Sequence, residues 1–582
     1  MAEEPIQRQV ESAKQSRSIS TAEHEFTNKL LNLRSEALMV REERSRDWSE
    51  YINLARNRNH WSKRLPKYKV DAIVNFIVPT IERKTALLTD TKPTIDVKAK
   101  RSSGLDSTAI VLKNVIDGIL LECNFDQKLA ELVTISQIVG CSPINTMWDS
   151  SLDFGRGDIN IVPADPRMVL IDPFIGRSYR VDRGEFCIID EVISLDKARD
   201  IYPNRADEIQ PSAEHSVFSQ TGDGMKQSLW SKVYKPFRHA AKPSVIPRTL
   251  RSEYWIKDRF KKDGKYYFNG AVRRVTVCGG TIVKDGGNPY LDGKFPIDML
   301  DWHFDMDSPY GWGDVELLKS PQKLTNKLLG VVLENAILMS NAIWVGDKDA
   351  LSKSDWAKLT NEPGSHVRKR TGKELRREAP PAMPEYIIHL ARYLQSAIGE
   401  ISGMVPTMLG MKSGQVSSGV GVEQLQMAAQ ALVRLKARAI EGLIQRVGQK
   451  LIARIFQYYT SDRLIMKLGK QDELEQYQMV RSELFGNKGE VPDAFKDYVF
   501  HVVPGSGLAM SKVQKSIVAT QLFQLGIIGE LELLETMEYP NAPEVAQKAR
   551  ERRELMQQQQ QQGGQAGQRS GMNRQIGMSG RI

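Results

Sequence analysis

The segment 384–459 constrains the fold more than any other part of the chain. Between residues 385 and 401, apolar residues recur at three- and four-residue steps, which predicts an amphipathic helix. Residues 402–421 are rich in glycine and serine and include a proline. A continuous helix there would cost roughly 1 kcal/mol per glycine and about 3 for the proline. The helical period returns over 422–459, giving a rod of about 57 Å at 1.5 Å per residue. This helix–loop–helix is either an ordinary antiparallel hairpin or a pair of supports for a loop with a function of its own.

The part of the chain before this segment mixes helical and strand patterns. Residues 1–60 are rich in charge and predict a solvated helical arm, and Val70 to Leu88 predicts a helix that is kinked at Pro79. Pro93 to Lys98 resembles a short strand, and Thr108 to Val139 predicts two helices. After Gly140 the period changes to two, with strand and turn signals from Cys141 to about Val192. The polar stretch from Pro203 to Arg248 is interpreted as a loop or an insertion, and a second group of hairpins is predicted after it. Residues 61–310 are therefore expected to form one α+β domain.

Further helices are expected on both sides of the opening segment. Ser320 and Pro321 fit an N-cap and a first-turn proline, so a helix is predicted from Pro321 to about Trp344, within the segment 311–344. A compact insert, 345–383, follows it, with a strand-like start and a basic run. Ser461 to Val491 is interpreted as a polar helix and Tyr498 to Val503 as a strand. Helices are then predicted over 510–525, 529–537 and 543–555, and the Gln- and Gly-rich end, 556–582, is expected to be disordered.

Composition narrows the class of protein. Four cysteines are scattered without metal-ligand or disulfide spacing, which favours a reducing, intracellular origin. The polar N-terminus and the lack of a long apolar run predict neither a signal peptide nor a membrane span. A net charge of +10 is compatible with contact to nucleic acid but does not require it.

Motifs of catalysis are missing from the sequence. It contains no GxxxxGK[ST] phosphate loop, HExxH, GxSxG or paired zinc-ligand spacing, so no catalytic, cofactor or metal residue is predicted. Asp305 with Asp307, and Asp153 with Asp158, could hold a cation, although carboxylates at turns more often cap the backbone. An ATP-driven or nucleolytic DNA enzyme would explain the basic charge, but these absences argue against it.

Three segments resemble the portal proteins of tailed bacteriophages, the rings through which DNA enters and leaves the capsid. SPYGWGDVELLKSPQKLTNKLLGVVLENAILMSNAIWV resembles the entry to the portal stem. ISGMVPTMLGMKSGQVSSGVGVEQLQ resembles the second stem helix running into the tunnel loop, and VVPGSGLAMSKVQKSIVATQLFQLGIIGELELLETMEYPNA resembles the crown. No short motif certifies the family; the resemblance rests on the ordered succession of these parts over about 70–555.

The resemblance implies a plan for the whole subunit and an α+β fold class. It comprises an N-terminal arm (1–60), an α+β wing (61–310), a two-helix stem (311–344 and 384–401), a small α/β clip (345–383), a tunnel loop (402–421), a long helix with a return to the wing (422–497), an α-helical crown (498–555) and a tail (556–582). The implied protein is not an enzyme and has no cofactor. It is a virion component made in the host cytoplasm.

The resemblance also implies partners. The family forms a homo-oligomeric twelve-fold ring at one capsid vertex, and double-stranded DNA passes through it. The ring docks the terminase during packaging, contacts the major capsid and scaffolding proteins, and later binds head–tail adaptor or tail proteins. A non-viral helical scaffold or oligomeric DNA-binding protein is the competing class, and the mass of the native particle separates the two.

Two groups of residues are candidate sites. The presumed tunnel loop carries one cation among small and polar side chains, a low-friction lining for sliding phosphates, since each neutralised phosphate strengthens the grip on DNA. Its candidate DNA-facing residues are Lys412, Ser413, Gln415, Ser417 and Ser418. The clip carries a dense basic patch, which either binds an acidic partner or DNA or is a solvated loop. Its residues are Arg368, Lys369, Arg370, Lys373, Arg376 and Arg377.

Overall fold

A computed structural model describes most of the 582 residues. The described residues are 4–58, 72–90, 93–100, 106–211, 247–257, 261–262, 265–266, 272–286, 289–340, 343–357, 359, 368–378, 384–404, 431–468, 474–485, 494–502, 519–537 and 545–552. They fall into two compact units: 1–467 with 475–507, and 468–474 with 508–582. The fold is mixed α+β with several small antiparallel sheets, as the sequence predicted.

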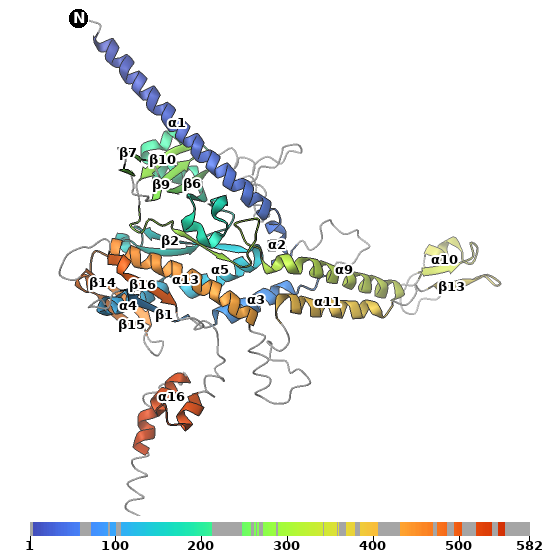
Figure 1. The fold of residues 1–582 in the computed structure, drawn as a ribbon. Coiled ribbons are helices and arrows are strands. Elements are labelled where there is room, and N and C mark those ends of the chain that lie inside the picture. Colours follow the sequence, from blue (N-terminus) through green and yellow to red (C-terminus); the bar gives the residue numbers. More distant parts are fainter. Residues whose placement is uncertain are drawn as a thin grey trace, which may run out of the picture. The chain divides into compact units, whose positions relative to one another are not determined.

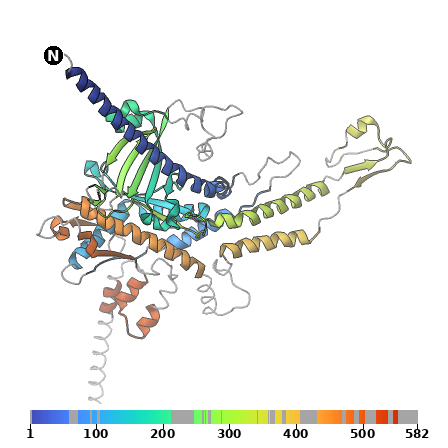
Figure 2. The same cartoon turned by 45° about the horizontal axis from the view of Figure 1, so that its top comes forward.

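A five-stranded antiparallel sheet forms one layer of the first unit. Its order is β10 (Thr281–Gly286), β9 (Val272–Cys278), β6 (Arg248–Lys257), β5 (Phe186–Ser194) and β4 (Val169–Ile171). The long helix α1 (Glu4–Ser45) crosses this sheet in Figures 1 and 2. Leu30 and Ala37 of α1 share a core cluster with Tyr254 of β6, and Arg34 Nη2 lies 2.9 Å from Asp190 Oδ2 of β5. The predicted N-terminal arm is therefore helical, and its second half is buried against the sheet.

A second sheet shares the main core with the first. It has three strands, β11 (Ile297–Asp301), β2 (Cys141–Asp149) and β3 (Asp158–Pro163), with β2 in the centre. Helices α2 (Trp48–Ala55), α3 (Ile77–Thr89), α4 (Asp106–Glu122) and α5 (Phe125–Val139) belong to the same unit. Gly140 ends α5 with a φ of 100°, which permits the sharp turn into β2 and confirms the predicted change of period.

Strands far apart in the sequence pair in the same unit. β1 (Ile95–Ala99) is antiparallel to β16 (Tyr498–Val502), which confirms both predicted strands over the described residues. Beside them lies α13 (Ala431–Tyr458), the described part of the predicted long helix. A Cβ added to Gly448 of α13 would lie 2.4 Å from ring carbons of Phe500, so only glycine allows this close approach.

The remaining elements are short. They are α6 (Leu195–Ile201), β7 (Lys261–Lys262), β8 (Lys265–Tyr266), and 3-10 turns at Asp153–Gly155, Pro173–Ile175, Ser178–Arg183, Pro203–Glu208 and Ala494–Asp497. The second unit contains α16 (Glu530–Thr536) and helical residues at 519–524 and 545–552, all within predicted helices.

Two long helices and a small lobe complete the first unit. α9 (Asp314–Ser340) and α11 (Tyr386–Ser402) run side by side, and the lobe contains β12 (Ile343–Gly346), α10 (Lys353–Ala357) and β13 (Leu375–Glu378) (Figures 1 and 2). The predicted start of the first helix was wrong: α9 begins at Asp314, and Pro321 lies inside it. The predicted end at Trp344 was also wrong, because that residue belongs to β12.

Two other predictions need correction. Ser461 to Val491 is not a polar helix, since its described residues form β14 (Arg463–Leu468), β15 (Leu474–Met479) and the short helix α14 (Arg481–Phe485). The missed signal was alternation, with Ile465 buried and Leu464 exposed. The helix predicted from Val70 starts only at Ile77, so Pro79 stands in its first turn and kinks nothing.

A row of buried ion pairs attaches α13 to the central sheet. Lys450 Nζ lies 3.0 Å from Asp298 Oδ2 of β11, and both side chains are fully buried. One turn later Arg454 Nη1 lies 3.0 Å from Asp292 Oδ2. Both cations also donate to backbone carbonyls, Lys450 to Ile297 and Arg454 to Thr146. Burial raises the pKa of Asp298, so this carboxylate depends on its cations to stay ionised.

Breaking this row is expected to destabilise the subunit strongly. Lys450→Met leaves the buried carboxylate of Asp298 without its closest cation and should lower the free energy of unfolding by about 3–5 kcal/mol. Adding Asp298→Leu removes the stranded charge and should recover more than half of that loss. Urea unfolding measures both effects, with Arg438→Met, an exposed position of α13, as the control. A Lys450→Met variant as stable as the control would contradict the prediction.

Candidate functional site: a helical stalk with a basic lobe

The stalk, defined as α9 and α11, starts from a cluster of charged groups. Asp314, the first residue of α9, lies 2.7 Å from Lys84 Nζ and 3.1 Å from His303 Nε2. Lys436 Nζ of α13 lies 3.1 Å from His303 Nδ1 and also bonds to the carbonyl of Trp302. An ionised carboxylate only accepts and an ammonium only donates, so in this geometry His303 Nε2 donates to Asp314 and His303 Nδ1 accepts from Lys436. One imidazole thus joins α9 to α13.

The charges in this cluster perturb one another. Burial by itself would raise the pKa of Asp314, but the His303 hydrogen bond and the Lys84 ion pair outweigh it and lower the pKa to about 2. Burial lowers the pKa of Lys436 to about 8. Sequence reasoning missed these residues because it started the helix at Pro321. The available signal was the pair of acids, Asp314 and Glu316, which favour the first turn of a helix.

Polar side chains hold the first half of α9 in place. The buried Gln322 accepts from the backbone N–H of Phe76 and donates to the carbonyl of Val74, at 2.9 and 2.6 Å. Glu50 of α2 forms ion pairs with Lys319 and Lys323 on another side of α9. The base of the stalk is therefore fixed from two directions.

The stalk leaves many apolar side chains exposed along its length. In α11, Leu394 and Ile398 are buried, whereas Tyr386, Ile388, Leu390, Tyr393 and Ile401 are exposed. In α9 four apolar residues spaced by seven form a stripe, with exposed fractions of 40, 44, 48 and 54%: Leu317, Leu324, Val331 and Leu338. Leu333 and Ile337 are exposed as well and point to a different side of the same helix.

The lobe carries the predicted basic patch. β12 and β13 pair so that Trp344 faces Arg377, whose guanidinium lies 5.5 Å from the indole ring centre. All six predicted cations are exposed and lie within residues 368–378: Arg368, Lys369, Arg370, Lys373, Arg376 and Arg377. Two acids, Glu374 and Glu378, lie in the same stretch, and Glu378 is 4.0 Å from Arg376.

The predicted DNA-facing residues of the tunnel loop were the second candidate site. Lys412, Ser413, Gln415, Ser417 and Ser418 lie outside the described residues.

The alternative cation sites have other partners. Asp158 accepts from the Tyr459 hydroxyl at 2.5 Å, and Asp305 accepts from the backbone N–H of Asp307 at 3.0 Å. Within the described ranges no group of three His, Cys, Asp or Glu side chains could hold a metal ion. None of the helices described is long and apolar enough to cross a membrane.

Comparison with known families decides the identity of the chain. The model of the phage P22-like portal protein family matches residues 44–579. The chain belongs to this portal family. No curated protein matches it. Membership makes the subunit a structural, non-enzymatic component of the virion, located at the portal vertex of the capsid. It also implies an oligomeric ring associated with capsid and DNA.

The charge cluster at the base of the portal stalk gives a pH-dependent contribution to stability. Because the pKa of Asp314 is lower in the folded state, its contribution is full above the unfolded pKa and is lost as pH falls towards 2. Asp314→Asn should lower the free energy of unfolding at neutral pH by about 2 kcal/mol and flatten its slope between about pH 4 and 2. Asp349→Asn, an exposed position in the lobe, is the control, and an unchanged slope in Asp314→Asn would refute the assignment.

Proposed function

We propose that the subunit forms a closed twelve-fold ring whose central channel conducts double-stranded DNA into and out of the capsid at one vertex. The observation that carries the proposal is the apolar surface of the stalk. The stripe Leu317, Leu324, Val331 and Leu338 drifts by only about 20° per seven residues on a straight helix, so these four residues form a seam along one side of it. Leu333 and Ile337 lie away from that seam, and α11 adds exposed residues of its own.

Apolar surface on several sides of a helix pair favours a ring over a dimer. A two-fold dimer buries one self-complementary patch, whereas a head-to-tail ring covers two different faces of every subunit. Scattered exposed apolar side chains need no explanation, but a contiguous patch of them marks an interaction site. The stalk combines a seam with apolar residues on a second side, which matches the requirement of a ring.

Each part of the subunit has a proposed role in this ring. The arm is 1–60, the wing 61–310, the stem 311–344 with 384–401, the clip 345–383, the tunnel loop 402–421, the long helix with its return to the wing 422–497, the crown 498–555 and the tail 556–582. The clip docks the terminase during packaging and head–tail adaptor or tail proteins afterwards. The wing region meets the major capsid and scaffolding proteins.

The tunnel loop is proposed to line the channel. Lys412 is its single cation, flanked by Ser413, Gln415, Ser417 and Ser418. Each neutralised phosphate steepens the salt dependence of DNA binding by about 0.9 log units, so a lining with few cations lets DNA slide.

Assembly is tested on the seam of α9. Val331→Glu with Leu338→Glu places two carboxylates per subunit on exposed positions, so the subunit should fold normally but lose the ring. Native mass spectrometry should then show monomers where the wild type shows a twelve-fold particle. The control is Gln395→Glu, an exposed polar position of α11, which should assemble. Intact rings in the doubly substituted protein, or a wild type that is only monomeric or dimeric, would refute the proposal.

The clip is tested separately from assembly. Replacing Arg368, Lys369 and Arg370 by Ser should leave the ring intact, because these side chains are exposed and bury nothing. Loss of charge from every subunit should weaken docking of the terminase or adaptor by at least tenfold and reduce its sensitivity to salt. Binding of purified rings to the partner at two salt concentrations measures this effect, and unchanged binding would show the patch to be only solvated.

A further inference from the structure

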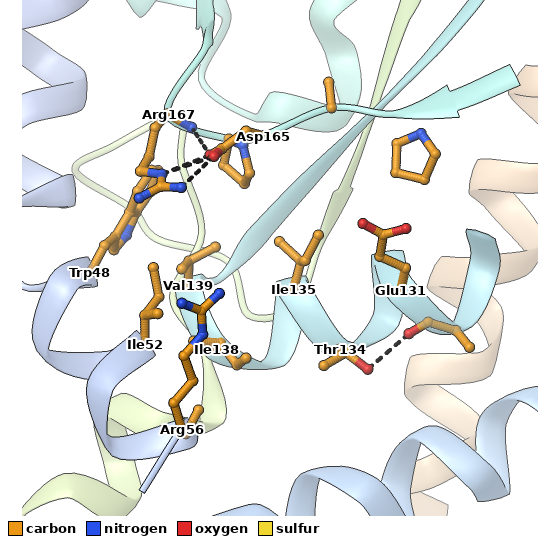
Figure 3. A pocket seen from close by; sticks show the side chains of 15 residues that line it. Trp48, Ile52, Arg56, Glu131, Thr134, Ile135, Ile138, Val139, Asp165 and Arg167 are labelled. Carbon is orange, nitrogen blue, oxygen red and sulfur yellow. Dashed lines mark hydrogen bonds and ion pairs between the residues drawn. The ribbon is translucent and has the colours of Figure 1, made fainter. Parts of the chain in front are cut away.

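A pocket of about 650 Å³ lies between α2, α5 and the turn that follows β3 (Figure 3). Its floor is apolar, formed by Ile52 of α2 and by Ile135, Ile138 and Val139 of α5. Pockets of roughly 300–1,000 Å³ hold a drug-sized ligand or several side chains. The space is therefore large enough for a short segment of another protein chain.

Two nitrogen donors lie at this pocket, one buried and one exposed. Trp48 is almost fully buried, and its Nε1–H has no acceptor within the described part of the chain. Arg56 extends from the end of α2 towards Ile138 and Val139 in Figure 3, and none of the described residues forms an ion pair with its guanidinium. Arg167 at the opposite edge is already paired with Asp165. Buried polar groups usually find partners, so the Trp48 indole calls for an acceptor in the pocket. Arg56 is exposed and places a positive charge at the edge of the pocket. The pocket therefore fits an occupant with apolar side chains and a carboxylate beside them.

A loop of the same chain has this composition. In residues 304–307, Phe304 and Met306 are 59% and 92% exposed, and the Asp307 carboxylate is without an ion pair to any described residue. The loop is held in shape, because Trp312 Nε1 donates to the carbonyl of Phe304 at 3.1 Å and the Arg177 guanidinium lies 5.5 Å from the Phe304 ring centre. The loop would therefore lose little conformational entropy on binding.

The loop does not enter the pocket of its own subunit. Leu317 of α9 borders the loop, whereas Lys319 contacts Glu50 of α2, and residues two apart on a helix point about 160° away from each other. The same spacing separates Glu50 from Ile52, which lines the pocket. Phe304 and Met306 are exposed in this subunit, so the loop leaves the pocket of its own chain unfilled. A head-to-tail ring brings such surfaces together between neighbours.

We propose that the 304–307 loop of each subunit seats in the α2–α5 pocket of the next copy, with Phe304 and Met306 on the apolar floor and Asp307 facing Arg56. The inference rests on the proposed ring and names one of its contacts. Leu317 lies beside the loop and also begins the exposed seam of α9, so seating the loop extends the same interface between copies.

A disulfide crosslink tests the contact. Ile52→Cys with Met306→Cys, in a background with Cys123→Ser, should give on mild oxidation a ladder of covalent oligomers that extends up to the ring. The other native cysteines are buried. Either substitution alone, and Ile52→Cys with Met39→Cys on α1, serve as controls and should give no ladder. Native mass spectrometry of every variant reports whether the ring is present.

Charge exchange supplies a second measurement. Arg56→Glu or Asp307→Arg alone should reduce the crosslink yield several-fold, and the two together should restore it. Rings without a ladder would overturn this contact and leave the ring standing. A second outcome would also overturn the contact: the thiol introduced by Ile52→Cys could be protected from maleimide and yet form no crosslink with the thiol introduced by Met306→Cys. Absence of any ring in the wild-type protein would overturn the proposed function, and this inference with it.

Discussion

The row of buried ion pairs beneath α13 is the interaction on which the rest of the first unit depends. Lys450 and Arg454 follow one another by one helical turn and meet carboxylates on and beside β11, so the helix can dock in only one axial position. A purely apolar face would tolerate sliding by a turn, because apolar contacts have no direction. If α13 slid by one turn, the buried charges of Lys450 and Arg454 would lose their partners. Gly448 of α13 faces Phe500 of β16, and its lack of a side chain then sets how closely β16 approaches the helix.

The fixed position of α13 also determines where the stalk begins. Lys436 lies on α13, and its contact with His303 leads to Asp314 at the start of α9 and onward to Lys84 of α3. The cluster therefore holds three helices together, with the His303 imidazole between Asp314 and Lys436. In a portal subunit this places the base of the stalk and the long helix on one rigid support.

Rigidity at the base contrasts with the incomplete burial farther along the stalk. The polar side chains of Gln322 and Glu50 anchor the first half of α9, whereas beyond them, among the described elements, α11 is the main cover. The far part of the seam, Val331 and Leu338, and the basic lobe therefore lie on the part of the subunit that has the fewest internal contacts to satisfy. Such a division lets assembly and docking surfaces change in sequence without disturbing the core, since exposed positions contribute little to stability.

The sequence by itself determined the elements whose signals are local. The periodicity of α11 and α13, the change of period at Gly140, and the strands β1 and β16 could all be read from neighbouring residues, and the order of segments was sufficient to indicate the portal family. Tertiary structure alone decided that β1 pairs with β16, that α9 starts at Asp314, and that Lys450 is buried. The start of α9 shows the reason: Ser320 and Pro321 give a strong local start signal, but Lys84 and His303, distant in sequence, stabilise an earlier turn. Periodicity is a property of adjacent residues, whereas an ion pair depends on distance in space, which only the folded chain defines.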